Sequence, residues 1–114
     1  MAKIECELAG NFDTILKELD DAVLDRSTTA SLEDSSDFTA GGTRCAVRVY
    51  ERYSWSGGNR VSMNLTLLET DGRIFLSLIT SGGSQAMFLK INTIGERAFL
   101  DTVREIADKY HRAR

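Results

Sequence analysis

The side chains that most often carry catalysis or bind metals are few in this 114-residue chain. His111 is the only histidine and stands close to the C-terminus, and chain ends are usually poorly ordered. Cys6 and Cys45 lack the CxxC spacing of redox and zinc sites. Each cysteine falls on the apolar phase of an alternating segment, where a free cysteine behaves as a small buried hydrophobe.

Glycine pairs and acidic clusters offer no better site. The glycine pairs at 41–42, 57–58 and 82–83 follow apolar segments instead of leading into helices, so they indicate turns and not a phosphate-binding loop. The acidic clusters at 20–21 and 33–37 lie on a polar helix face and in a polar segment, which is typical of solvated carboxylates. We therefore predict no catalytic, cofactor-binding or metal-binding residue, and a protein that is not an enzyme.

Arginine and aromatic residues alternate along three segments, and this pattern is the strongest candidate for a functional surface. Residues 43–53 and 60–68 show the period of two that predicts strands, and residues 73–80 are apolar on both faces, which is typical of a central or interface strand. We take Cys45, Val47 and Val49 of the first segment as inward. In the second segment Val61, Met63, Leu65 and Leu67 are inward, and Leu68 points outward. The predicted outer face of the sheet then forms a candidate interaction face of Arg44, Arg48, Tyr50, Arg52, Arg60, Asn64, Arg73, Phe75 and Ile79.

Three interpretations of this face compete. Arginines and aromatic rings on a sheet can stack bases and hold phosphates, but the net charge of −3 argues against nucleic acid. Arginine, Phe75, Ile79 and Leu68 could instead form a self-associating patch, because arginine and aromatic residues are enriched at interfaces. The third interpretation is an ordinary solvated face. We expect a binding or assembly module that forms a homodimer through its sheet.

The remaining elements would position this face. Alternation over residues 3–8 predicts a first strand, and Phe12, Ile15, Leu19 and Val23 form the stripe of an amphipathic helix capped by Asn11 or Asp13. Residues 28–32 suggest a further strand, the segment 34–42 a turn or loop, and 86–89 a short strand or irregular packing. Asp71-Gly72 predicts a tight hairpin. Thr93 and Glu96 have the spacing of a capping box before a closing helix.

These elements predict one α+β domain over residues 1–114. Two helices with single apolar stripes can share one face of an antiparallel sheet, which gives a two-layer sandwich of order β-α-β-β-β-β-α. That order resembles the TATA-box-binding-protein-like and helix-grip arrangements. The chain, which opens MAKIE and ends in the helical ERAFLDTVREIADKY, is also similar to small uncharacterised bacterial α+β families. The resemblance implies the fold and carries over no functional residue.

A helix-grip arrangement suggests a second hypothesis, a small apolar ligand held between the sheet and the closing helix. Its candidate pocket residues are Trp55, Met63, Met87, Phe88 and Phe99. An ordinary hydrophobic core is the alternative for the same residues.

Charge and hydropathy add further expectations. Residues 1–38 hold three basic and ten acidic side chains, whereas 39–114 hold eleven basic and seven acidic ones, so the two parts could be complementary within the fold or between copies. No apolar run reaches the length of a membrane span, and the N-terminal residues lack the pattern of a secretory signal. We expect a cytoplasmic protein without a membrane partner.

Overall fold

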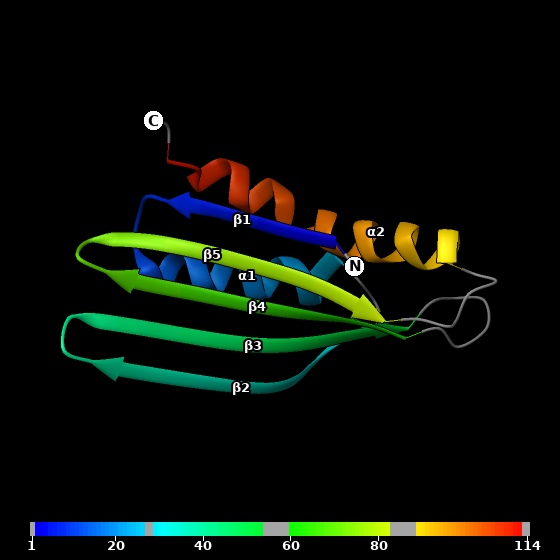
Figure 1. Ribbon diagram of the computed structural model, residues 1–114, viewed down its shortest axis with the longest axis horizontal. Helices are drawn as coiled ribbons and strands as arrows, with labels where there is room; N and C mark the ends of the chain where they lie inside the picture. The colour runs from blue at the N-terminus through cyan, green and yellow to red at the C-terminus, as the bar shows by residue number, and fades with distance from the viewer. Residues whose placement is uncertain (1, 27–28, 54–59, 83–88, 113–114) are drawn as a thin grey trace.

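The computed structural model has a helical layer packed on a five-stranded antiparallel sheet (Figure 1). It describes residues 2–26, 29–53, 60–82 and 89–112, with side chains described from Phe99 onward in the last segment. The elements are β1 (Ala2–Leu8), α1 (Phe12–Arg26), β2 (Ala30–Ala40), β3 (Thr43–Tyr53), β4 (Arg60–Thr70), β5 (Arg73–Gly82) and α2 (Leu89–Tyr110). The predicted α+β class and the order β-α-β-β-β-β-α are confirmed.

The sheet order is β1-β5-β4-β3-β2, so the four strands from β2 to β5 form a meander and β1 adds to the far edge of β5. Asp71 and Gly72 both have positive φ, at 53° and 73°. This is the geometry of the type I′ turn, and it confirms the predicted tight hairpin between β4 and β5. The connection predicted over 54–59 lies outside the described residues.

Both helices cover the same face of the sheet. The α1 residues Asp13 and Asp20 contact Arg44 and Tyr50 of β3, and Phe99 of α2 lies beneath Arg52 of the same strand. These three β3 residues are two, six or eight positions apart, and residues at even spacing share a face of a strand. The opposite face, called here the open face, carries no described helix, as Figure 1 shows with α1 behind the strands.

The helix predictions are confirmed in α1 and partly wrong in α2. Asn11 caps α1, because its side-chain oxygen accepts from the Thr14 amide at 2.9 Å. The predicted stripe of α1 is buried. The structure starts α2 at Leu89, so Thr93 lies inside the helix and does not cap it. The remainder of the ambiguous segment, 86–88, lies outside the described residues.

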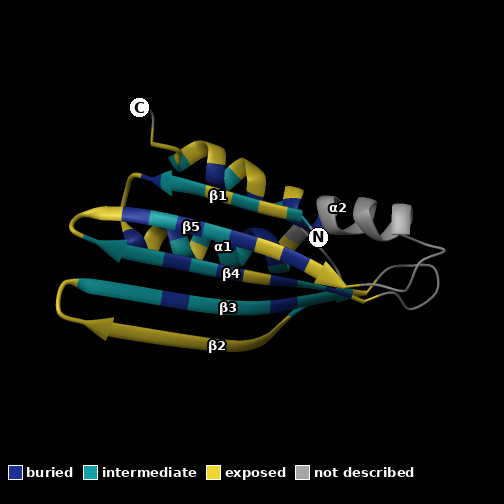
Figure 2. Ribbon diagram, viewed as in Figure 1, coloured by how far each residue is buried: buried dark blue, intermediate teal, exposed yellow. Residues whose placement is uncertain are grey.

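Residues 34–40, predicted as turn or loop, form most of the edge strand β2. Their backbone pairs with β3, from Asp34 opposite Val49 to Ala40 opposite Thr43, after an irregularity between Leu32 and Asp34. Serine and aspartate have low strand propensity, but the neighbouring strand offers a complete ladder of backbone partners. The side chains of this edge stay exposed (Figure 2).

One hydrophobic core fills the space between the sheet and the helices. Its sheet side includes Met63, Leu65 and Leu67 of β4 together with Ile74, Leu76 and Leu78 of β5. On β3 the buried residues are Ala46 and Tyr50, which pair with Leu67 and Met63. The even-numbered residues of β3 therefore face the helices, and the predicted phase of this strand is wrong.

Candidate interaction face

The change of phase on β3 corrects four of the nine residues proposed for the interaction face. Arg44, Arg48, Tyr50 and Arg52 belong to the helix-covered side of the sheet. Arg60, Asn64, Arg73, Phe75 and Ile79 do lie on the open face, as the strand registers show. Alternation separated the two sides of β3 correctly. The side that was predicted to face the helices lies on the open face, and the side predicted to be open faces the helices.

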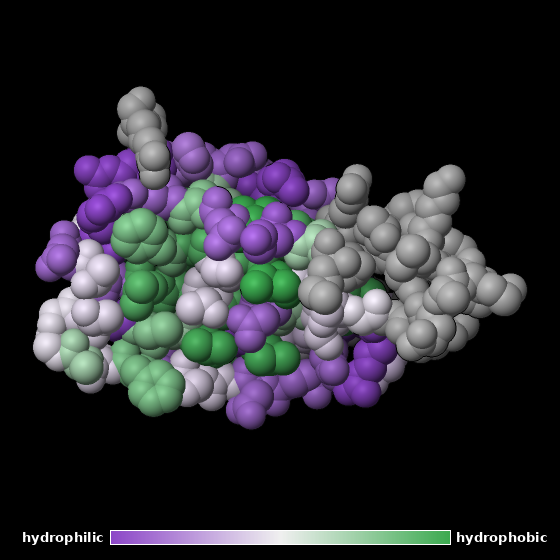
Figure 3. Space-filling view, viewed as in Figure 1, coloured by the Kyte–Doolittle hydropathy of each residue, from purple (hydrophilic) through white to green (hydrophobic). Residues whose placement is uncertain are grey.

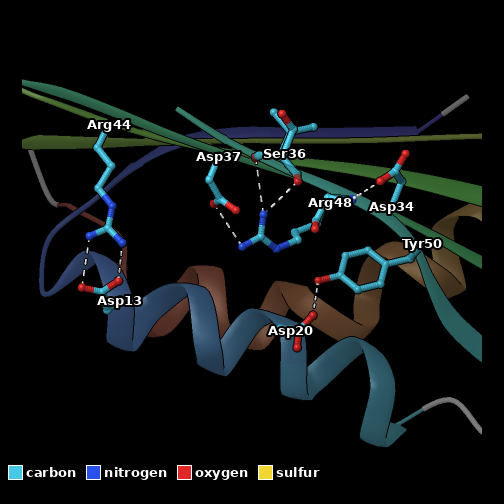
Figure 4. Close-up of polar contacts among 10 residues, drawn as sticks. Asp13, Asp20, Asp34, Ser36, Asp37, Arg44, Arg48 and Tyr50 are labelled. Carbon is cyan, nitrogen blue, oxygen red and sulfur yellow. Dashed lines mark hydrogen bonds and ion pairs between the residues drawn. The ribbon is translucent and has the colours of Figure 1, made fainter. Parts of the chain in front are cut away.

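Acidic residues of α1 and β2 provide the reason for this phase (Figure 4). Arg44 donates two hydrogen bonds to Asp13, at 3.1 and 2.5 Å, and its guanidinium lies 4.3 Å from the centre of the Phe12 ring. Arg48 donates to Asp37 at 3.1 Å and to its neighbour's carbonyl, that of Val47, at 2.9 Å. The aliphatic parts of the arginines cover the sheet while their charged ends reach carboxylates.

Tyr50 both packs in the hydrophobic core and forms a hydrogen bond to a carboxylate of α1. Its ring is fully buried, and its hydroxyl donates to Asp20 of α1 at 2.5 Å. Burial, followed by this hydrogen bond to a carboxylate, raises the pKa of the Tyr50 phenol far above its usual range. Tyr50 is therefore a neutral structural donor in the folded protein.

Arg52 lies against the ring of Phe99, with the guanidinium 4.8 Å from the ring centre. Burial lowers the pKa of Arg52 from its ordinary value.

Phe99 and Met63, two of the five proposed pocket residues, have no exposed surface and belong to the core. Trp55, Met87 and Phe88 lie outside the described residues.

The open face is more apolar than the sequence predicted, because the other side of β3 joins it. Its large or branched apolar side chains and one cysteine, here called the apolar patch, are Phe38, Cys45, Val47, Val49, Leu68, Phe75 and Ile79. Phe38 is 65% exposed and Ile79 40% exposed, while the other five are partly covered by their neighbours. Figure 3 shows hydrophobic side chains over the middle of this face, with hydrophilic ones among and around them.

Sequence reasoning missed Phe38, Cys45, Val47 and Val49 as members of this surface. Phe38 was hidden in a segment predicted as loop, and the three β3 residues were taken as core because they are the more hydrophobic side of the strand. The acidic face of α1 was the available signal, because its residues Asp13 and Asp20 accept hydrogen bonds from Arg44 and Tyr50 of β3.

The arginines of the open face are already paired within the chain. Arg73 donates to Glu7 at 3.1 and 2.7 Å and lies over the ring of Phe75. Arg60 pairs with Glu51 and lies over Tyr53. These pairs stand near the ends of the strands, so the described open face has no basic excess at its centre.

The uneven charge of the chain is largely matched within the fold. Basic residues from the later part of the sequence reach acidic residues before position 38, as in the pairs of Arg44 with Asp13, Arg73 with Glu7 and Lys109 with Glu18. The Arg44 hydrogen bonds lower the pKa of Asp13, and hydrogen bonds from Lys109 and Tyr110 lower that of Glu18.

Two shallow hollows lie on the open face. One, of about 440 Å³, extends over β1, β5 and β4 and includes Glu7, Leu68 and Phe75 in its lining. The other, of about 130 Å³, lies over β2 and β3 beside Val47 and Val49. Both are open to solvent, and neither gathers the side chains of a catalytic site.

Within the described residues, no three side chains of histidine, cysteine, aspartate or glutamate are grouped so that they could hold a metal ion. Cys6 faces α2, where burial and then the nearby Asp108 raise the pKa of its thiol. His111 forms a backbone bridge to Leu8, which attaches the end of the described chain to β1. None of the described helices has the length and apolar character needed to cross a membrane.

Comparison with known proteins gives a family without a known activity. No curated protein matches the chain, and no solved structure matches it. A family model described as "Family of unknown function (DUF6054)" matches residues 1–111, and the chain belongs to this family.

Proposed function

We propose that the protein is a non-enzymatic assembly module that forms a homodimer by packing the open face of its sheet against the open face of a second copy. The observation that carries this proposal is the apolar patch, which occupies the centre of a face that no described helix covers. Antiparallel sheets with one solvated face normally place polar residues there. Contiguous apolar surface of this kind marks interaction sites.

The size of the face suits a stable pair of copies. The strands β2 to β5, of 10 or 11 residues, are about 35 Å long, and β1, of 7 residues, is about 24 Å long. Five strands at ~4.8 Å spacing are about 24 Å wide. Such a face offers roughly 800 Å² to a partner, which is the contribution of one protein to an interface of standard size. A second sheet of the same shape would cover it completely, as in a β-sandwich.

The polar composition of the face also favours a protein partner over nucleic acid. The two open-face arginines are neutralised by Glu7 and Glu51, and three of the arginines that suggested phosphate binding lie on the helix-covered side. Asn64, Thr66 and Ser77 add neutral hydrogen-bonding groups near the centre. Protein–protein interfaces combine apolar side chains with about one hydrogen bond per 100–200 Å², so these neutral groups suit a protein partner.

Light scattering on a size-exclusion column tests the proposal. The protein at micromolar concentration should show twice the 12.6 kDa mass of the chain. Phe75→Asp should return it to the monomer mass, because an unpaired carboxylate would be buried at the interface. Ile79→Asp repeats the test at a more exposed position, where the protomer fold depends less on the side chain.

Thr39→Asp provides the matched control, because Thr39 is an exposed strand residue paired with Arg44 on the other side of the sheet. It should leave the dimer mass unchanged, and circular dichroism should show that all three variants are folded. A wild-type protein that stays monomeric up to 100 micromolar, or a folded Phe75→Asp variant that stays dimeric, would overturn the proposal.

A further inference from the structure

The strand registers arrange the centre of the open face in three rows that cross the sheet from β1 to β2, with β4 in the middle. The first row is Glu7, Phe75, Leu68, Cys45 and Phe38. The second row is Glu5, Ser77, Thr66, Val47 and Ser36. The third row is Lys3, Ile79, Asn64, Val49 and Asp34.

The first row contains a protruding side chain and a hollow on opposite sides of β4. Phe38, at the β2 end, is 65% exposed. The hollow of about 440 Å³ lies toward the β1 end of the row, where Glu7, Phe75 and Leu68 contribute to its lining. A phenylalanine side chain is small enough to enter such a hollow, and its burial there would remove apolar surface from water on both sides.

The third row ends in opposite charges. Lys3 stands at the β1 edge and Asp34 at the β2 edge. Four strand spacings separate these edges, about 19 Å, so the two side chains cannot pair within one chain. Lys3 contacts Glu5 of its own strand at 3.1 Å. Both Lys3 and Asp34 are exposed on edge strands, where they can meet a second sheet placed over the first.

We infer, on the basis of the self-association proposed above, that two copies pack about a two-fold axis parallel to β4. Rotation about that axis preserves each row and reverses the strand order, so β1 of one copy lies over β2 of the other. Phe38 of each copy then enters the hollow of its partner, and Lys3 of each copy faces Asp34 of the other. Leu68 and Asn64, on β4, each face their own counterpart.

A two-fold axis that runs across the strands gives a poorer match. It places β1 over β1 and β2 over β2, so that Phe38 of one copy lies away from the hollow of the other. It also places Phe38 opposite Asp34. The ~30° angle usual between packed sheets corresponds to a tilt of the proposed axis by about 15° from β4, which shifts the edge strands by about 5 Å, a distance that a lysine side chain can span.

Charge exchange at the two edges tests this geometry. Lys3→Asp alone should give dimers with two like-charged contacts, as should Asp34→Lys alone, and each should dimerise about tenfold more weakly than the wild type. A mixture of the two variants should form heterodimers in which both contacts are complementary. Native mass spectrometry on a mixture with one variant isotopically labelled should show the heterodimer well above the statistical half.

The matched control uses Lys17→Asp and Asp21→Lys, which exchange the same residue types on the exposed face of α1. Their mixture should give a statistical distribution. A wild-type dimer whose edge variants also mix statistically would overturn the axis and leave the proposed function standing. A wild-type monomer would overturn both. Phe38→Ala should weaken the dimer at least tenfold, and an unchanged dissociation constant would contradict the insertion of Phe38.

Discussion

The side chains on the two faces of the sheet differ in what they contact. On the helix-covered face, arginine and tyrosine side chains of β3 end at carboxylates of α1 and β2, and the apolar residues of β4 and β5 pack beneath the helices. On the open face, apolar side chains of the same three strands have no described element above them. The fold covers one face with its own helices and leaves apolar side chains on the other without a described cover, and this second face is the one that we propose for the homodimer.

The largest expected difference between the faces is in the cost of truncating an apolar side chain. Leu65 is fully buried on the helix-covered face, so Leu65→Ala should lower the free energy of unfolding by about 3 kcal/mol. Ile79→Ala on the open face should cost about 1 kcal/mol or less, because the side chain is 40% exposed. Urea denaturation in the Phe75→Asp background would measure both effects on the monomer. Equal costs would contradict the distinction between the faces.

A second prediction concerns the hydroxyl of Tyr50. Tyr50→Phe removes the donor to Asp20 and should lower the free energy of unfolding by about 1 to 2 kcal/mol, since a hydrogen bond to a charged acceptor is lost. Asp20→Asn, which keeps an acceptor oxygen, should cost less. The dimer mass should not change in either variant, because the contact lies on the helix-covered face. If Tyr50→Phe abolished the dimer, the two faces would not be independent, and the distinction between them would be contradicted.

The smallest expected effect is the response of the helix-covered side to acid. The pKa values of Asp13 and Glu18 are lowered in the folded protein by their cationic partners. Their pairing therefore stabilises the fold above the unfolded carboxyl pKa of about 4, and this stabilisation is lost as the pH falls through the folded values. The urea midpoint should fall between about pH 5 and pH 3.

Arg44→Ala combined with Lys109→Ala should flatten this dependence, because the pKa values of both carboxyls would return toward their ordinary range. A variant with the same acid response as the wild type would show that these pairs contribute little to the stability of the helix-covered side.

The sequence was sufficient for the order of elements and insufficient for the assignment of one strand. Clean alternation in β1 and β4, the apolar stripe of α1 and the Asp71-Gly72 turn are local signals, and each was confirmed. The phase of β3 depends on non-local partners. Val47 and Val49 are more hydrophobic than Arg44 and Arg48, so hydropathy selects the wrong side unless the carboxylates of α1 are considered.

The same limit applies to β2 and to the candidate site. The polar segment 34–40 has no strand signal of its own and is a strand because β3 lies beside it. Without β2 in the sheet, Phe38 could not be placed on the open face. The interaction face predicted from alternation therefore had the correct β4 and β5 residues and lacked the residues of β2 and β3 that make it apolar.

The reaction rate of Cys45 with a thiol reagent tests most directly whether the open face is covered in solution. Cys45 belongs to the apolar patch, whereas Cys6 lies toward the helices, so a Cys6→Ser background isolates the relevant thiol. The rate should fall as the protein concentration rises through the dimer dissociation constant, and it should stay constant in the Phe75→Asp variant. A wild-type rate that is independent of concentration from nanomolar to 100 micromolar would contradict the account.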